Sequence, residues 1–313
     1  MEAVLRRHGA YGGADLSAGG RIGALRDVLA AVVPGALADV DALGDAIGPE
    51  LDAYGEFIAS AEAPVAGVLV RGEGAGFTRR VAALLDDWGM PEESRRFHAT
   101  LAEAFEHKRV FLKLEWQRAA KTERQVAVYY RRRPRVHDAL KLLAAFTGTC
   151  LRLQDFRELG ALLGKDTVHF VAFTTRADAP LQYKFYFSQY LTPDSYAAAD
   201  HRLQRCVQRF VGDSPAVTRW LAYRDRLAPR HREQTLFVSL AQSEDGGDGS
   251  LKIDYPDVAP LVAAGLLDGR SAAQAEERLR WLCEAAGRDE LSYLGLRLGA
   301  GAHPVLKGYA DLP

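Results

Sequence analysis

Four lysines are the side chains of this sequence best placed to do chemistry. Of the 40 basic residues only eight are lysines, and half of these lie inside short segments with the composition of β-strands. They are Lys113 in FLKLEW, Lys184 in YKFYF, Lys252 in SLKIDY and Lys307 in VLKGYA. Ammonium groups that share one enclosed site repel one another unless an anion or water compensates them. A pyrophosphate fits such a cluster, because its oxygens can be shared among separate ammonium groups.

A second polar residue follows three of these lysines at a spacing of two. The pairs are Lys184 with Tyr186, Lys252 with Asp254 and Lys307 with Tyr309. Residues i and i+2 share one face of a strand, so each segment has one polar and one aliphatic face. A single strand lysine more often lies on an exposed face or blunts a sheet edge. Repetition of the pattern in several segments favours a shared polar interior instead.

Other side chains that are predicted to lie on the same strand faces as the lysines would complete this site. Arg131 and Arg297 are candidate neighbours of the lysines, and Tyr129, Tyr186 and Tyr309 would offer hydroxyl groups to the same anion. The faces of the tyrosine rings could also stabilise an adjacent carbocation, by ~1–2 kcal/mol per ring when water is excluded. The pattern therefore indicates a site for a diphosphate next to a reactive cation.

The segments that carry these residues follow a regular plan. Each pair of strand-like segments is joined by a short polar or Gly-rich link, which is typical of a hairpin, and helical segments separate the pairs. One more strand is predicted at 65–72, after a region with helical spacing from 22 to 58. The pairs are 109–117 with 125–132, 167–174 with 181–189, 234–241 with 250–255, and 290–298 with 304–309.

Hairpins on this scale predict a closed sheet. Strands joined in hairpins cannot form the parallel sheet of a doubly wound fold. Four or five hairpins give eight to ten antiparallel strands, and closure of so wide a sheet removes its exposed edges. We predict an α/β fold: a closed antiparallel barrel of about ten strands, with helices outside and a polar lumen. Residues 21–313 are predicted to form this single domain, and residues 1–20 to be poorly ordered.

Composition excludes several other classes of protein. A net charge of −1 argues against binding to nucleic acids or anionic membranes through bulk charge. Three widely spaced cysteines without a CxxC motif support neither a disulfide framework nor a zinc site, and the scattered histidines predict no metal site. No signal peptide and no apolar run of ~20 residues is found. We therefore predict a cytoplasmic protein. We expect a monomer or a weak dimer, although the sequence leaves the oligomeric state open.

The plan resembles the aromatic prenyltransferases of the ABBA, or PT-barrel, fold over about 65–313. YKFYF and LKGYADLP resemble the Lys-x-Tyr elements of the indole (dimethylallyltryptophan synthase-type) branch. VFLKLEWQRAAKTERQVAVYYRR and LSYLGLRLGAGAHPVLKGYAD are similar to hairpins of the bacterial phenol and phenazine branch. The resemblance implies that Lys184, Lys252 and Lys307 bind diphosphate, and that Tyr186 and Tyr309 shield the allyl cation. The family favours a tyrosine where this chain has Asp254, which would hold Lys252 or a magnesium ion instead.

The resemblance implies a transferase of secondary metabolism. It would move a dimethylallyl or longer group from its diphosphate to an electron-rich aromatic small molecule, an indole or a phenol, with no cofactor required and magnesium possible. Glu115, two residues after Lys113, is the candidate acceptor of the proton released, and a salt bridge to Lys113 is its alternative role. Two other functions stay open: a cyclase or isomerase on the same barrel that acts on a different anionic substrate, and a non-catalytic binding protein.

Overall fold

Ten strands form the centre of the protein. The computed structural model describes residues 33–311, apart from gaps at 54, 62–64, 106–108, 118–122, 148–150, 193, 229–233, 244–249, 300 and 302, and also residues 23, 26 and 30. The predicted poorly ordered segment 1–20 lies outside these residues. The strands are β1 (Gly55–Ser60), β2 (Val65–Glu73), β3 (Arg109–Gln117), β4 (Glu123–Arg131), β5 (Phe170–Arg176), β6 (Ala179–Leu191), β7 (Gln234–Ser243), β8 (Ser250–Val258), β9 (Leu291–Leu298) and β10 (Val305–Asp311).

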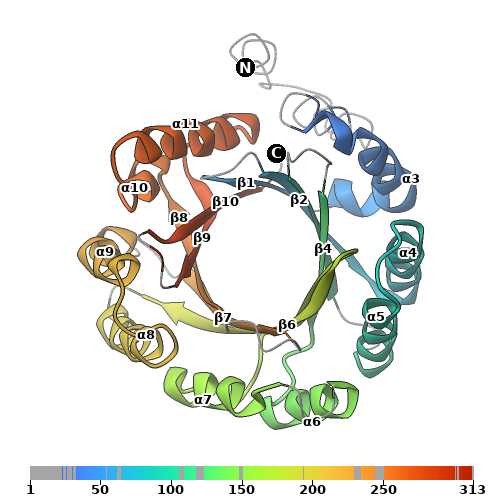
Figure 1. Ribbon diagram of the computed structural model, residues 1–313, viewed down its shortest axis with the longest axis horizontal. Helices are drawn as coiled ribbons and strands as arrows, with labels where there is room; N and C mark the ends of the chain where they lie inside the picture. Colours follow the sequence, from blue (N-terminus) through green and yellow to red (C-terminus); the bar gives the residue numbers. More distant parts are fainter. Residues whose placement is uncertain are drawn as a thin grey trace.

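The strands close into one antiparallel barrel. Each strand pairs with its neighbours in the sequence, and β1 pairs with both β2 and β10, so that the ring has no free edge (Figure 1). Closure in this way satisfies the backbone hydrogen-bonding groups that an open sheet would expose at its two outer strands. The prediction of a closed antiparallel barrel of about ten strands is confirmed.

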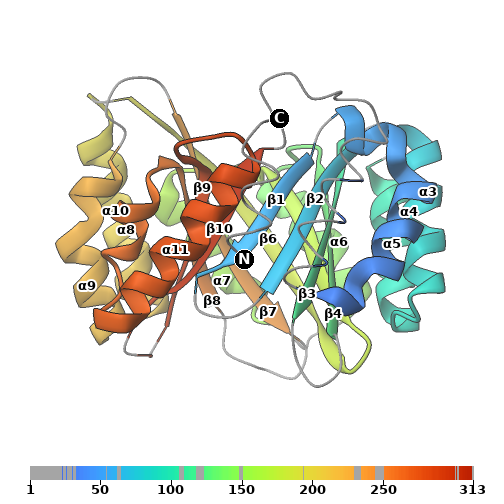
Figure 2. The same cartoon turned by 90° about the horizontal axis from the view of Figure 1, so that it is seen from above.

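Helices surround the ring of strands, as the view along the barrel shows (Figure 1). The turned view places α3 to α5 on one flank and α8 to α10 on the other (Figure 2). In the described part of the chain, no helix is long and apolar enough to cross a membrane. The helices are α3 (Leu37–Ala53), α4 (Gly74–Asp87), α5 (Glu92–Ala104), α6 (Val136–Thr147), α7 (Leu153–Leu163), α8 (Tyr196–Phe210), α9 (Pro215–Tyr223), α10 (Pro260–Ala264) and α11 (Gly269–Ala285), with 3-10 turns at Pro34–Ala36 and Arg224–Leu227.

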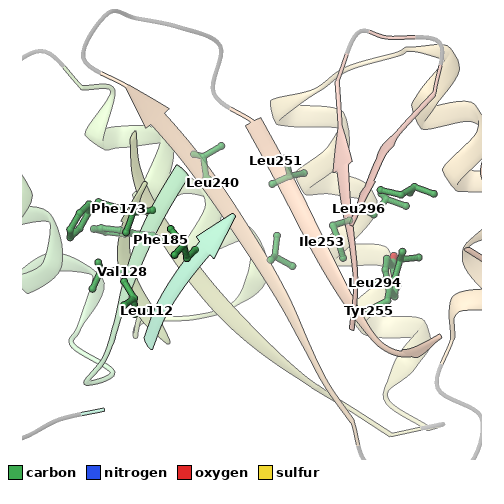
Figure 3. Packing of buried hydrophobic residues seen from close by; sticks show 14 of the residues in the cluster. Leu112, Val128, Phe173, Phe185, Leu240, Leu251, Ile253, Tyr255, Leu294 and Leu296 are labelled. Atoms are coloured by element: carbon green, nitrogen blue, oxygen red, sulfur yellow. The ribbon is translucent and has the colours of Figure 1, made fainter. Parts of the chain in front are cut away.

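The hydrophobic core lies between the strands and the helices. Leu112, Val128 and Phe173 are successive register partners on β3, β4 and β5, and all are buried (Figure 3). On β6, Phe185 packs against Phe156 of α7, with 4.5 Å between ring centroids. Burial of side chains of this size stabilises the fold by ~1.5–3 kcal/mol each. Because side chains alternate along a strand, the residues between these positions face the lumen.

The first strand differs from the prediction. Helical spacing from 22 to 58 predicted a helix through Ile58, but Gly55–Ser60 forms β1. A short apolar run does not distinguish a buried strand from the end of a helix by its periodicity. Pairing with β2 on one side and β10 on the other decides between them, because β1 is the strand that closes the ring.

Candidate active site

A cavity of about 750 Å³ occupies one end of the barrel lumen. It lies where the even-numbered strands lead on into helices, since Arg71, Arg131 and Ser188 line it from the later parts of β2, β4 and β6. Eight aromatic residues line it, together with charged and hydroxyl side chains. The aromatic residues are Phe111, Tyr129, Phe170, Tyr186, Tyr190, Phe237, Tyr293 and Tyr309. The cavity can therefore hold a planar apolar ligand in contact with cationic groups.

Three charged residues form a chain of ion pairs across the lumen. The Lys113 ammonium is 3.0 Å from Oε1 of Glu115, and the Lys307 ammonium is 2.7 Å from Oε2. Burial opposes the charged carboxylate, but the two lysines outweigh it and hold the pKa of Glu115 well below its usual range. Burial also lowers the pKa of Lys307 to about 8, although Glu115 opposes that change. The alternative role predicted for Glu115, a salt bridge to Lys113, is therefore present.

Lys184 lies in the lumen with a hydroxyl group for a partner. It is buried on β6 and donates a hydrogen bond of 2.7 Å to Oγ1 of Thr174 on β5. Among the described residues no carboxylate pairs with it. Burial, followed by the charges of Lys113 and Arg297, lowers the pKa of Lys184 well below its usual value. A bound anion would restore its positive charge, which makes Lys184 the lysine most in need of an anionic ligand.

Lys252 contacts both the cavity and a carboxylate. Its ammonium is 2.5 Å from Oδ1 of Asp254 and donates a hydrogen bond of 2.9 Å to the hydroxyl of Tyr309. Burial disfavours the charge, but Asp254 overcomes it and raises the pKa of Lys252. Asp254 thus holds Lys252, which is one of the two roles that the sequence left open for it. A Cβ at Gly295 would lie 2.5 Å from Cε of Lys252, so a larger residue there would have to displace the end of this lysine side chain.

The two predicted arginines lie at different levels of the barrel. Arg297 is the register partner of Lys252 and therefore adjoins the lysines. Arg131 lies four residues beyond Ala127, the register partner of Lys113. At ~3.3 Å per residue this separation is about 13 Å along the strand. Arg131 lines the open end of the cavity, and the structure does not bring it into the lysine cluster.

The three predicted tyrosines meet beside the lysines. Tyr129, Tyr186 and Tyr309 belong to a small apolar cluster inside the barrel, separate from the core between strands and helices. The ring centroids of Tyr129 and Tyr186 are 5.5 Å apart. Burial raises the pKa of each hydroxyl above its usual value, so these groups stay protonated and can donate hydrogen bonds.

An aromatic belt in the cavity wall was not predicted. Phe170 lies 5.4 Å from Phe111 and 5.8 Å from Phe237, and Tyr293 lies 5.6 Å from Phe237, measured between ring centroids. A signal for part of this belt was present in the sequence. Phe111 precedes Lys113 by two residues and so shares its face of β3. The belt gives an aromatic ligand surfaces to pack against.

Four acidic or basic side chains that line the cavity were also missed. Glu56 lines it from β1, the strand that was predicted to be helical, and it is buried. Arg133, Lys165 and His169 line it from the connections outside the strands. Arg133 and Lys165 lie outside the predicted strands, and in the predicted strand 167–174 His169 has the opposite parity to Phe170, so parity did not identify these three. Among the described residues, no three His, Cys, Asp or Glu side chains group as metal ligands.

The ring of ten strands around a lysine-lined lumen defines a PT-barrel, so the predicted resemblance to the ABBA-fold aromatic prenyltransferases is confirmed for the fold. The prenyltransferase PriB, solved with L-tryptophan and dimethylallyl thiolodiphosphate, matches over 95% of both chains with a TM-score of 0.62 and 15% identity. The 6-dimethylallyltryptophan synthase of Micromonospora olivasterospora matches over 95% of this chain and 97% of its own, with a TM-score of 0.63 and 14% identity. The 5-dimethylallyltryptophan synthase of Streptomyces coelicolor matches over 94% of both chains, with a TM-score of 0.60 and 15% identity. No family model and no curated protein matches the sequence.

Proposed function

We propose that this protein is an aromatic prenyltransferase that moves an allylic group from its diphosphate to an electron-rich aromatic small molecule. The observation that carries the proposal is the meeting of Lys113, Lys184, Lys252 and Lys307 inside one lumen, next to a cavity walled by aromatic rings. Solved proteins with this fold include complexes with a dimethylallyl diphosphate analogue and tryptophan. Their likeness supports the class of reaction, and the side chains of this lumen support the details below.

The lysine cluster would bind the diphosphate and stabilise its departure. Its four lysines face two carboxylates, Glu115 and Asp254, so the described lumen has more basic than acidic groups. As the C–O bond breaks, negative charge grows on the diphosphate, and ammonium groups already in place lower the free energy of that transition state. Arg297 lies close enough to contribute. The proposal requires no metal ion, because the ammonium groups supply the charge.

The tyrosines would protect the allyl cation that remains. Tyr129, Tyr186 and Tyr309 border the lysines, and water in their place would capture the cation as an alcohol. Their ring faces stabilise the positive charge by ~1–2 kcal/mol each in a site without water. The acceptor ring then forms a C–C bond with the cation and loses a proton. Tyr186 and Tyr309 are the shield residues on which this step is expected to depend most: both line the cavity, and Tyr309 accepts a hydrogen bond from Lys252.

The proton released by the ring needs a carboxylate that the acceptor can reach. Glu115 was the predicted acceptor, but both of its oxygens bind lysines and it does not line the cavity. A carboxylate whose pKa is so far depressed is a weak base. Asp254 lines the cavity but adjoins Lys252, where the diphosphate is expected. We therefore assign the proton to Glu56, which lines the cavity from β1.

The Glu56→Gln variant should test this assignment. We expect kcat to fall ~100-fold or more, because general base catalysis contributes ~10²–10⁴-fold. The affinity for dimethylallyl diphosphate should not change, since Glu56 is not part of the lysine cluster. Product formation under single-turnover conditions, together with calorimetric titration of the diphosphate, measures the two effects separately. An unchanged kcat in this variant would show that a group other than Glu56 accepts the proton.

The proposed function itself is tested by a search for prenylated products. Purified protein incubated with dimethylallyl diphosphate and a panel of indoles and phenols should give products that carry one added prenyl group in mass spectrometry. A protein boiled before the incubation is the control. An isomerised or cyclised prenyl chain without transfer would favour the cyclase or isomerase alternative. Binding of the diphosphate without turnover across the panel would favour a binding protein. A cytoplasmic location, a role in secondary metabolism and a monomeric or weakly dimeric state are parts of this proposal.

A further inference from the structure

We propose that the open end of the cavity is a second anion subsite, formed by Arg131, Arg133, Lys165 and His169, which selects acceptors that carry a carboxylate. The inference rests on the proposed function and names the acceptor class. The diphosphate would bind at the lysine end of the lumen, the aromatic ring would lie in the middle, and the carboxylate of the acceptor would lie at the mouth.

Three cations line this end without an acidic partner. Among the described residues, no carboxylate forms an ion pair with Arg131, Arg133 or Lys165, although all three line the cavity. Several arginines elsewhere in the described structure are paired, for example Arg109, which is 2.6 Å from Glu73, and Arg124, which contacts Asp39. Unpaired cations directed to one cavity favour a negatively charged ligand there.

The cations at the mouth also repel one another. Arg131 on β4 and Arg109 on β3 are register partners, so the two positions lie opposite each other, and within the described ranges only Arg109 has a carboxylate partner, Glu73. Burial lowers the pKa of Arg131, and the charges of Arg133, Arg109 and Arg71 lower it further. Like charges at facing positions destabilise a sheet. A carboxylate bound between Arg131 and Arg133 would remove this repulsion and could accept two parallel hydrogen bonds from one guanidinium group.

His169 adds a polar atom that has no partner in the described structure. Its Nδ1 is buried and makes no hydrogen bond, while its ring packs 4.5 Å from Phe170 and 5.0 Å from Phe237. Burial and the nearby charges of Arg131 and Arg133 lower the pKa of His169 to about 4, so the imidazole is neutral near pH 7. A neutral ring can carry its proton on Nδ1 and donate a hydrogen bond to a carboxylate. Buried polar atoms rarely stay unpaired, so this Nδ1 is available to a ligand atom.

The backbone at Arg133 supports a role at the mouth. Its φ is 61°, in the left-handed region that residues with a side chain seldom adopt. Such a conformation costs ~1–3 kcal/mol and persists where surrounding structure imposes it, often at ligand sites. It occurs here two residues after the end of β4, at a residue that lines the cavity.

The distance between the two anion sites leaves room for an aromatic ring. Arg131 is about 13 Å along β4 from the level of Lys113, at ~3.3 Å per residue. Tyr129, Phe170 and Tyr186 line the cavity between these levels. An aromatic acceptor with a short acidic side chain would span this interval, with its ring against the aromatic belt and its carboxylate at the arginines.

Matched acids and amides test the subsite. The probes are indole-3-propanoate with indole-3-propanamide, and 3-(4-hydroxyphenyl)propanoate with its amide, titrated calorimetrically into protein saturated with pyrophosphate so that the lysines are occupied. We expect at least one acid to bind about tenfold or more tightly than its amide, as a charge-assisted pair that excludes water would give. The Arg131→Gln/Arg133→Gln variant should abolish that preference. His169→Phe, which retains the ring packing, should weaken the acid and leave the amide unchanged.

The controls separate this subsite from the proposed function. Arg205→Gln removes an exposed arginine of α8 and should change no affinity. Equal binding of acid and amide, a preference that survives in the double variant, or no binding of any probe would overturn the subsite. Loss of pyrophosphate affinity in the double variant would also overturn it, because the arginines would then serve the diphosphate. Prenylated product is measured in parallel samples with dimethylallyl diphosphate. A preference for the acid without any prenylated product contradicts prenyl transfer and leaves the subsite standing. Prenylated product without a preference for the acid supports prenyl transfer and contradicts the subsite.

Discussion

Replacement of Lys252 by methionine should weaken the binding of inorganic pyrophosphate ~10- to 100-fold. A hydrogen bond to a charged group is worth ~1.5–3 kcal/mol, which corresponds to that range of affinity. Lys252 is the choice among the four lysines because it is the one whose side chain lines the cavity. Calorimetric titration measures the dissociation constant, and the exposed Lys141 of α6 gives a matched control, since Lys141→Met should have no effect.

The neighbour of Lys252 requires a second variant. Without the lysine, the carboxylate of Asp254 would lack the ammonium that now lies 2.5 Å away and would repel the pyrophosphate. The Lys252→Met/Asp254→Asn variant removes both charges and should still bind more weakly than Asp254→Asn alone. If Lys252, Lys184 and Lys307 could each be replaced without a change in affinity, a diphosphate site in this lumen would be ruled out.

The Glu115→Gln variant should lower the free energy of unfolding by ~3–5 kcal/mol, the loss typical when one partner of a buried ion pair is removed. Glu115 is 1% exposed, and the change would leave two ammonium groups inside the barrel without their carboxylate. Urea denaturation followed by circular dichroism measures the effect. Glu103→Gln, on the exposed face of α5, should change the free energy of unfolding by less than ~0.5 kcal/mol.

A triple variant shows whether the loss comes from unpaired charge. Lys113→Met/Glu115→Leu/Lys307→Met replaces the whole chain of ion pairs with apolar side chains, an exchange that is often neutral or stabilising. We expect it to recover most of the stability that Glu115→Gln loses. A triple variant less stable than Glu115→Gln would show that the shape of these side chains matters more than their charge.

Strand parity is enough to predict the centre of the site. A lysine and a tyrosine two residues apart must share a face, and aliphatic neighbours on the other face require a cover of helices. Lys184 with Tyr186 and Lys307 with Tyr309 therefore identify the lumen side of β6 and β10 from the amino-acid sequence alone. The hairpin links then limit the sheet to antiparallel strands, for which closure is the economical solution.

The alternation of side chains along a strand shows which face of the sheet a residue is on. It does not show how far along the barrel the residue lies or which residue it contacts across the ring. Arg131 has the predicted orientation but lies about four residues from the level of Lys113, and register decides this. Glu115 reaches Lys307 from the other end of the chain, a contact that no local pattern contains. Glu56 was missed because β1 is a strand only through its two neighbours. The level of Arg131, the contact of Glu115 with Lys307 and the strand conformation at Glu56 all depend on pairing between distant segments rather than on local sequence preference.

The pairing of β1 with β10 joins the two ends of the described sheet, and Ser60 is the register partner of Lys307. Contacts between segments so far apart in sequence cost the most chain entropy and form slowly. Until they form, the lumen stays open to water along one seam, and Glu115 and Lys307 remain apart. Under the proposed function, an incomplete barrel would let water capture the allyl cation in place of the aromatic acceptor. Closure of the β1–β10 pairing would then be required for prenyl transfer in preference to hydrolysis.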